Sequence, residues 1–240
     1  MLSLQPRRFR PSGFFCFVTQ RDRCMRVRVY VDGFNSYYGA LKARPASRWL
    51  DLVTLSRLLR PGDTIDATRY FTARVKGDRD AKAPGRQKLY LTALGTLSSV
   101  TVHFGQFRTH PVGMPLADPE QGRTRIARVL KTEEKGSDVN LATYLLLDGF
   151  DGLYESAVVI SDDSDLEAPV REANRRFGPV HVISPRGPMS TPAGPKAPYQ
   201  MSHAGSSWTP LDPALLLAAQ LPSPLRLRSG RSIHRPPTWT

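Results

Sequence analysis

Four aspartates stand where strand-like runs end or helix-like runs begin, and their chemistry suits a bound cation. Asp32 ends the run VRVYV within the stretch VDGFN, and Asp163 and Asp165 follow the apolar run AVVI within ISDDSDL. Asp138 lies in KGSDVN, at the expected start of a helix. In an open parallel sheet, strand ends and the starts of the following helices meet along one edge. We therefore expect the four carboxylates to gather at that edge.

Clustered carboxylates repel one another, and a fold tolerates them best where a cation binds. Oxygen ligands without nearby cysteine or clustered histidine favour Mg²⁺ or Mn²⁺ over Zn²⁺. Each acid also has a structural explanation. Asp138 and Asp165 would lie in first helical turns, where the helix dipole favours a carboxylate, and Asp32 with Gly33 would form a turn. The metal site is thus predicted from the pattern of acids and not from any single one.

Three segments of the chain resemble the signature segments of NYN-domain proteins, a branch of the PIN-like nucleases. They are VDGFN, KGSDVNLA and VVISDDSDL, in the same order and at similar spacing. WLDL, YFTARV and KTEEKGSDVNLATYLLLDGF resemble a bacterial subgroup, and the resemblance covers residues 25 to about 185. It implies an α/β fold in three layers, a Rossmann-like (PIN-like) parallel sheet with helices on both faces. It also implies metal-dependent hydrolysis of RNA phosphodiester bonds.

The resemblance carries over to individual positions. It implies that one or two Mg²⁺ or Mn²⁺ ions are held by four catalytic acids: Asp32, Asp138, Asp163 and Asp165. Asn35 matches a family carboxamide that would orient water or a phosphate oxygen. The chain departs from the pattern at Tyr144, where many members have a further aspartate, and Asp148 lies one turn too deep to replace it.

Cations near the acids are expected to hold the phosphates of an RNA strand. Lys135 lies three residues before Asp138, at the start of KGSDVN. Arg74 and Lys76 lie in the loop RVKGDRDAK, which follows an expected strand and should therefore open at the same edge of the sheet as the acids. Together with Asn35, these are the predicted substrate-binding residues. The alternative for the loop is a solvated segment of mixed charge, because two aspartates interrupt the basic run.

Strand-like and helix-like segments alternate from Met25 onward, which predicts a parallel sheet covered by helices. We expect strands over residues 27–31, 64–75, 99–107, 157–161 and 179–184, and helices over 36–43, 51–59, 83–97, 137–147 and 164–177. A loop containing three prolines and two glycines is expected over residues 111–122.

Composition divides the chain into three parts. Residues 1–24 form a basic extension, which is either disordered or lies before a natural start at Met25, and residues 25–185 form the NYN-type domain. Residues 186–240 are rich in proline, which predicts loop or disorder, with a short helix near 213–220. The formal net charge of +13 has large contributions from the two ends and favours polyanions such as RNA.

Neither a membrane span nor a disulfide framework is indicated. The sequence has no run of about 18 apolar residues, and its two cysteines form no ligand or disulfide pattern. We expect a cytoplasmic protein with no membrane partner. Sheet edges in such folds often pair, which leaves a homodimer open.

Two rival functions follow from the same residues. A catalytically degenerate module would bind RNA or a protein without cutting, and Tyr144 and the proline-rich end favour that alternative. A phosphohydrolase acting through an aspartyl phosphate would want a second aspartate two residues after Asp32, where Phe34 stands.

Overall fold

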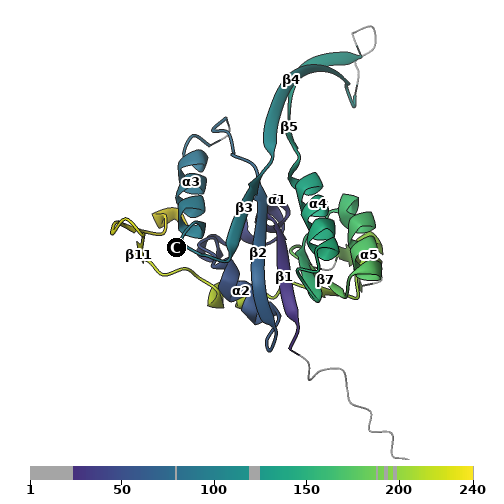
Figure 1. The fold of residues 1–240 in the computed structure, drawn as a ribbon. Coiled ribbons are helices and arrows are strands. Elements are labelled where there is room, and N and C mark those ends of the chain that lie inside the picture. Colours follow the sequence, from purple (N-terminus) through teal and green to yellow (C-terminus); the bar gives the residue numbers. More distant parts are fainter. Residues whose placement is uncertain are drawn as a thin grey trace, which may run out of the picture.

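A computed structural model describes residues 24–78, 80–118, 125–187, 189–191, 194–196 and 199–239. Its centre is a six-stranded sheet in the order β10-β7-β6-β1-β2-β3, in which every neighbouring pair is parallel (Figure 1). The strands are β1 (Arg26–Asp32), β2 (Thr64–Thr72), β3 (Val100–Phe104), β6 (Ser156–Ile160), β7 (Val180–Ser184) and β10 (Ser207–Pro210). Helices lie on both faces, so the expected three-layer, Rossmann-like α/β fold is confirmed.

The central strands divide their side chains between two buried cores, as the alternation of a strand requires. In β1, Val27, Val29 and Val31 enter one core, whereas Tyr30 enters the other. All five residues of β6 are buried, which is typical of a parallel strand covered on both faces.

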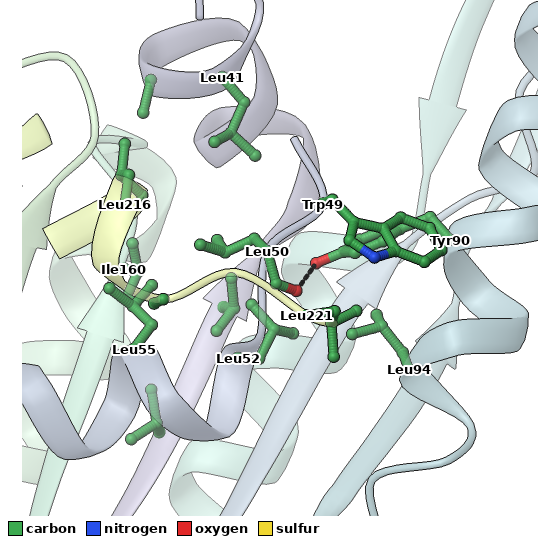
Figure 2. Close-up of a cluster of buried hydrophobic side chains, with 14 of the residues drawn as sticks. Leu41, Trp49, Leu50, Leu52, Leu55, Tyr90, Leu94, Ile160, Leu216 and Leu221 are labelled. Atoms are coloured by element: carbon green, nitrogen blue, oxygen red, sulfur yellow. Dashed lines mark hydrogen bonds between the residues drawn. The ribbon is translucent and has the colours of Figure 1, made fainter. Parts of the chain in front are cut away.

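Helices α2 (Leu52–Leu59), α3 (Ala83–Leu94) and α7 (Pro213–Ala218) cover the first face. The core beneath them contains Trp49 and Tyr90, and the Tyr90 hydroxyl donates to the Leu50 carbonyl oxygen at 3.0 Å (Figure 2). Helices α4 (Ser137–Phe150), α5 (Glu167–Arg176) and α6 (Tyr199–Ala204) cover the other face. Short helical segments complete the body: α1 (Gly33–Ser36), η1 (Tyr37–Leu41), η2 (Pro45–Ser47), η3 (Ser164–Leu166) and η4 (Pro237–Trp239).

The region between β3 and α4 differs from the expectation of one strand followed by a loop. Strand β3 ends at Phe104, and β4 (Gln106–Pro115) pairs antiparallel with β5 (Ile126–Lys135) to form an arm that projects beyond the sheet (Figure 1). The predicted loop over 111–122 is therefore wrong for residues 111–115. Its glycine and prolines suggested a loop, but cross-strand pairing with a distant segment places them in a strand.

The described part of the proline-rich region also differs from the expectation of loop or disorder. Strand β10 extends the main sheet beside β7, and Trp239 is buried against Trp49 and Tyr90. A few apolar side chains thus dock a segment whose composition alone argued against structure. Two small antiparallel pairs accompany it, β8 (Met189–Thr191) with β9 (Gly194–Lys196) and β11 (Leu225–Arg226) with β12 (Ser232–Ile233). The basic extension over residues 1–24 lies outside the described residues except for Cys24.

Among the described helices, none combines the length and apolarity needed to cross a membrane.

Candidate functional site

Three of the predicted acids meet at the carboxyl edge of the sheet. Oxygen atoms of Asp32, Asp138 and Asp163 all lie within 4.8 Å of one another. Asp32 ends β1, Asp138 lies in the first turn of α4, and Asp163 caps η3 directly after β6. Three segments far apart in the sequence therefore supply one carboxylate each, as expected for the ends of neighbouring parallel strands.

Hydrogen bonds fix two of these carboxylates in place. Asp32 accepts from the Asn35 backbone N–H at 2.9 Å and from the Ser161 hydroxyl at 2.8 Å. The same Ser161 oxygen accepts from the Asp163 backbone N–H at 3.1 Å, and Asn35 Oδ1 accepts from the Asp162 backbone N–H at 3.1 Å. The VDGFN and ISDDSDL segments are thereby joined directly, so the position of one acid determines that of the next.

Gly33 is needed because the chain passes very close to its neighbour after Asp32. A Cβ atom at Gly33 would lie 2.7 Å from the Phe71 carbonyl oxygen and equally close to the Tyr70 ring. A side chain at this position would therefore push β1 and α1 away from β2, and Asp32 with them.

The electrostatics of the cluster are those of uncompensated like charges. Burial, followed by repulsion from Asp32 and Asp163, raises the pKa of Asp138 to about 7. Burial also raises the pKa of Asp32, although its hydrogen bonds act in the opposite direction. Within the described part of the chain, no lysine or arginine forms an ion pair with any of the three acids.

The acids line an open cavity of about 330 Å³. Two aromatic side chains, Phe34 and Tyr38, and one cation, Arg186, also line it. Aromatic rings can stack on bases and a cation can contact phosphate, so these residue types suit a nucleic-acid strand. The cavity also contains Asn35, Glu134 and Ser137.

The remaining predicted site residues do not line this cavity. Asp165 is outside the close group, although its charge contributes to the raised pKa of Asp138. Lys135 is exposed and lies 3.6 Å from Glu133, the guanidinium of Arg74 packs over the Phe104 ring, and Lys76 donates to Thr109 on the arm. None of these three cations lines the acidic cavity, so their binding of substrate stays a prediction.

Two charged residues of the cavity, Glu134 and Arg186, were missed by the sequence reasoning. Glu134 accepts from the Ser137 backbone N–H at 3.2 Å and from its hydroxyl at 2.6 Å, which places a fourth carboxylate near Asp138. The signal for Glu134 was its position four residues before Asp138 in KTEEKGSD. Arg186 follows the last predicted strand directly, at the same edge of the sheet, and that position was the available signal.

Tyr144 and Asp148 both lie away from the cavity. The Tyr144 ring packs 4.1 Å from the His103 ring and 4.5 Å from the Arg69 guanidinium carbon. Asp148 is buried and accepts from Tyr30 and Arg69, each at 2.7 Å. The expectation that Asp148 lies too deep to join the acids agrees with these contacts.

Comparisons with known proteins give a distant enzyme relative. No family model matches the chain. It is 29% identical over 183 residues to the 6-hydroxy-3-succinoylpyridine 3-monooxygenase HspA of Pseudomonas putida, and the match covers 66% of this chain and 58% of that protein. The chain thus spans less than two thirds of this curated relative. A solved structure of a Vibrio parahaemolyticus protein of unknown function has a TM-score of 0.45 and 14% identity, covering 80% of this chain and 96% of that one.

Proposed function

We propose that the protein is a metal-dependent ribonuclease of the NYN type, which hydrolyses phosphodiester bonds at the acidic cavity. The observation that carries the proposal is the close group of Asp32, Asp138 and Asp163, supplied by three separate segments. Structural acids in proteins are usually paired with cations, whereas among the described residues these three contact one another and neutral hydrogen-bond donors and form no ion pair.

The donor set fits Mg²⁺ or Mn²⁺. Its ligand atoms are hard carboxylate oxygens, and the described residues offer no histidine or cysteine in the same group. Asp32, Asp138 and Asp163 would hold the ion, with Glu134 beside them. When bound, such an ion would lower the pKa of a water molecule and neutralise charge developing on the scissile phosphate.

The residues of the chain itself would bind and orient the substrate. Arg186 provides a cation on the wall of the cavity and would contact a phosphate oxygen. Tyr38 and Phe34 also line the cavity, and a base would stack on the parts of these rings that Lys42 and Phe107 leave uncovered. Asn35 would act mainly by holding the segment after β6 in place, since its side-chain oxygen accepts from the Asp162 backbone N–H.

The proposal is tested by incubating labelled RNA of mixed sequence with the purified protein in Mn²⁺, in Mg²⁺ and in chelator. Asp163→Asn should abolish the metal-dependent cleavage, whereas Asp165→Asn, whose side chain lies outside the close group, should retain most of it. Equal loss in both variants would contradict the assignment of ligands. Binding of RNA without cleavage by the wild-type protein would favour the degenerate module instead.

A second candidate function is hydroxylation of a small aromatic heterocycle, which the similarity to the Pseudomonas putida monooxygenase favours. The cavity of about 330 Å³ is large enough for such a ligand. Incubation with 6-hydroxy-3-succinoylpyridine, a reduced nicotinamide cofactor and oxygen, followed by mass spectrometry of the products, separates the two candidates. A product in which an oxygen atom from O₂ replaces the succinoyl group at ring position 3, with release of that side chain, would support the second candidate and leave the ribonuclease proposal to the RNA assay.

A further inference from the structure

Arg186 is a cation in an acidic cavity that pairs with none of the acids. It lines the cavity together with Asp138, Asp163 and Glu134. Within the part of the chain that the structure describes, no ion pair joins its guanidinium to a carboxylate. A long arginine side chain with several carboxylates nearby is attracted toward them. Its position therefore depends on how the surrounding chain holds it.

The carboxylate of Asp162 holds the backbone of Arg186. Asp162 Oδ2 accepts from the Arg186 backbone N–H at 3.0 Å, and the Asp162 backbone N–H donates to Asn35 Oδ1 at 3.1 Å. The segment after β7 is thereby joined to the segment after β6 and, through it, to VDGFN. The other carboxylate oxygen of Asp162 is buried and has no hydrogen-bond partner among the described residues. A buried, unpaired oxygen costs free energy, so stability of the fold is a poor explanation for an acid at this position.

Gly39 brings the side chain of Arg186 close to η1. A Cβ atom at Gly39 would lie 2.9 Å from the Cγ atom of Arg186 and 2.9 Å from the Cβ atom of Pro185. Glycine allows this close approach, which a larger residue would prevent. Gly39 also follows Tyr38, another residue of the cavity wall. Two separate contacts, one through the backbone and one through the side chain, therefore determine where Arg186 lies.

We propose that Asp162 and Gly39 position Arg186 so that its guanidinium binds a phosphate of the substrate strand and not the metal-binding acids. This role rests on the proposed function of the cavity and goes beyond it, because it makes Asp162 a positioning residue that acts through Arg186. A substrate phosphate supplies the negative partner that Arg186 lacks among the described residues, and a guanidinium binds phosphate through two parallel hydrogen bonds. Contacts to phosphate position a strand without reading its bases, so binding through Arg186 should not depend on base sequence.

The alternative role for Asp162 is that of a further metal ligand, since Asp163 follows it directly. The close group of acids contains Asp163 but not Asp162, and the same holds for the walls of the cavity. One oxygen of Asp162 is occupied by the Arg186 backbone N–H, and the other is buried. These contacts favour positioning over metal binding.

Fluorescence anisotropy of a labelled single-stranded RNA of mixed sequence tests the proposal on the full chain. Ca²⁺ replaces Mg²⁺ in this assay, and a gel confirms that the RNA stays intact. Arg186→Ala should raise the dissociation constant at least about tenfold, through loss of a charge-assisted hydrogen bond. Asp162→Ala and Gly39→Ala should each raise it about threefold or more, because both displace Arg186. Gly85→Ala, the same substitution at a helical glycine that faces open space, is the matched control and should bind RNA like the wild-type protein.

The sign of the change separates positioning from simple charge. Loss of a negative charge near the cavity would by itself strengthen binding of a polyanion, so weaker binding by Asp162→Ala has to come from another cause. Asp162→Asn keeps an acceptor for the Arg186 backbone N–H and should bind RNA at least as tightly as the wild-type protein. Loss of affinity in Asp162→Asn as large as in Asp162→Ala would overturn the proposal.

A double variant tests whether Asp162 acts through Arg186. In the Arg186→Ala background, Asp162→Ala should cause no further loss of RNA affinity. A further loss of the same size would show a general structural role and overturn the proposal. Calorimetric titration with Mn²⁺ tests the alternative role: Asp162→Asn should bind Mn²⁺ as Asp165→Asn does, and a larger loss would assign Asp162 to the metal.

These results are distinguishable from the fate of the ribonuclease proposal. Cleavage of RNA by the wild-type protein with unchanged RNA affinity in Asp162→Ala would retain the ribonuclease and overturn the positioning of Arg186. The full pattern of affinities without cleavage would support the positioning and assign the cavity to a binding module. Hydrogen exchange at the Arg186 backbone N–H, which Asp162→Ala should speed and Asp162→Asn should not, tests the contact without RNA. Unchanged exchange in Asp162→Ala would overturn the proposal, and circular dichroism checks that each variant folds.

Discussion

Binding of a divalent cation to the acidic cavity should be strongly linked to pH. The pKa of Asp138 is raised to about 7 by burial and by the neighbouring Asp32 and Asp163. A cation must displace the proton that this carboxyl group holds at neutral pH, so the affinity should rise with pH. Lowering the pH through 7 should therefore weaken binding, whereas a site built from ordinary surface aspartates would lose affinity only near about pH 4.

The magnitude follows from the fraction of Asp138 that is ionised. With a pKa of about 7, about one molecule in eleven is ionised at pH 6 and about ten in eleven at pH 8. The apparent dissociation constant for Mn²⁺ should therefore be about tenfold weaker at pH 6 than at pH 8. At pH 7, about half a proton should be released per bound ion.

Isothermal titration calorimetry with Mn²⁺ at pH 6, 7 and 8 measures both quantities, since buffers of different ionisation enthalpy report the protons released. Asp138→Asn should bind weakly and lose this pH dependence, whereas Asp165→Asn should retain it. Equal wild-type affinities at pH 6 and pH 8 would refute the reasoning. So would an unchanged pH dependence in Asp138→Asn.

The remaining predictions concern the elements that hold the site, and urea denaturation followed by circular dichroism checks each. Asp148→Ala should lower the free energy of unfolding by about 3–5 kcal/mol, because it leaves two arginines without their buried partner. Asp66→Ala, which removes a more exposed partner of one of them, should cost less than about 1 kcal/mol, and equal losses would contradict this account. Gly33→Ala should cost about 1–3 kcal/mol through its backbone clash, whereas Gly85→Ala, which faces open space, should be neutral or slightly stabilising. Trp239→Ala should cost about 3–5 kcal/mol, and an unchanged midpoint would show that the C-terminal end does not stabilise the core.

The acidic group could be predicted from the sequence because two of its members lie at or just after the ends of strands, and the ends of strands can be recognised in the sequence. Asp32 ends β1 and Asp163 follows β6 after Ser161 and Asp162, and parallel strands bring their carboxyl ends to one edge. Asp165 was grouped with them because it lies two residues after Asp163. Its backbone N–H instead donates to the Asp163 carboxylate, and its side chain lies outside the close group. Such local capping cannot be read from spacing alone.

The arm explains most of what the sequence reasoning missed at the site. Lys135 was predicted to bind substrate because it lies close to Asp138 in the sequence, whereas Glu134 was not considered, and neighbouring residues of a strand face opposite sides. Glu134 faces the cavity, while Lys135 is exposed and near Glu133. The pairing of β4 with β5 is a long-range contact between a glycine- and proline-containing segment and a charged one, and neither segment predicts the other by itself.

Two aspartates of the same helix differ in whether the protein compensates their negative charge. Asp148, near the end of α4, is buried, and burial alone would raise its pKa, but hydrogen bonds from Arg69 and Tyr30 hold the pKa below its ordinary value. Asp138, in the first turn, has no such partners among the described residues, and its pKa is raised. A carboxylate whose charge is already neutralised by arginines would be stabilised little by a bound cation. Asp138 has no such partner among the described residues, so a bound cation would stabilise its charged form. The contrast supports the proposal that the acids at the carboxyl edge of the sheet serve to bind a positive ion and not to stabilise the fold.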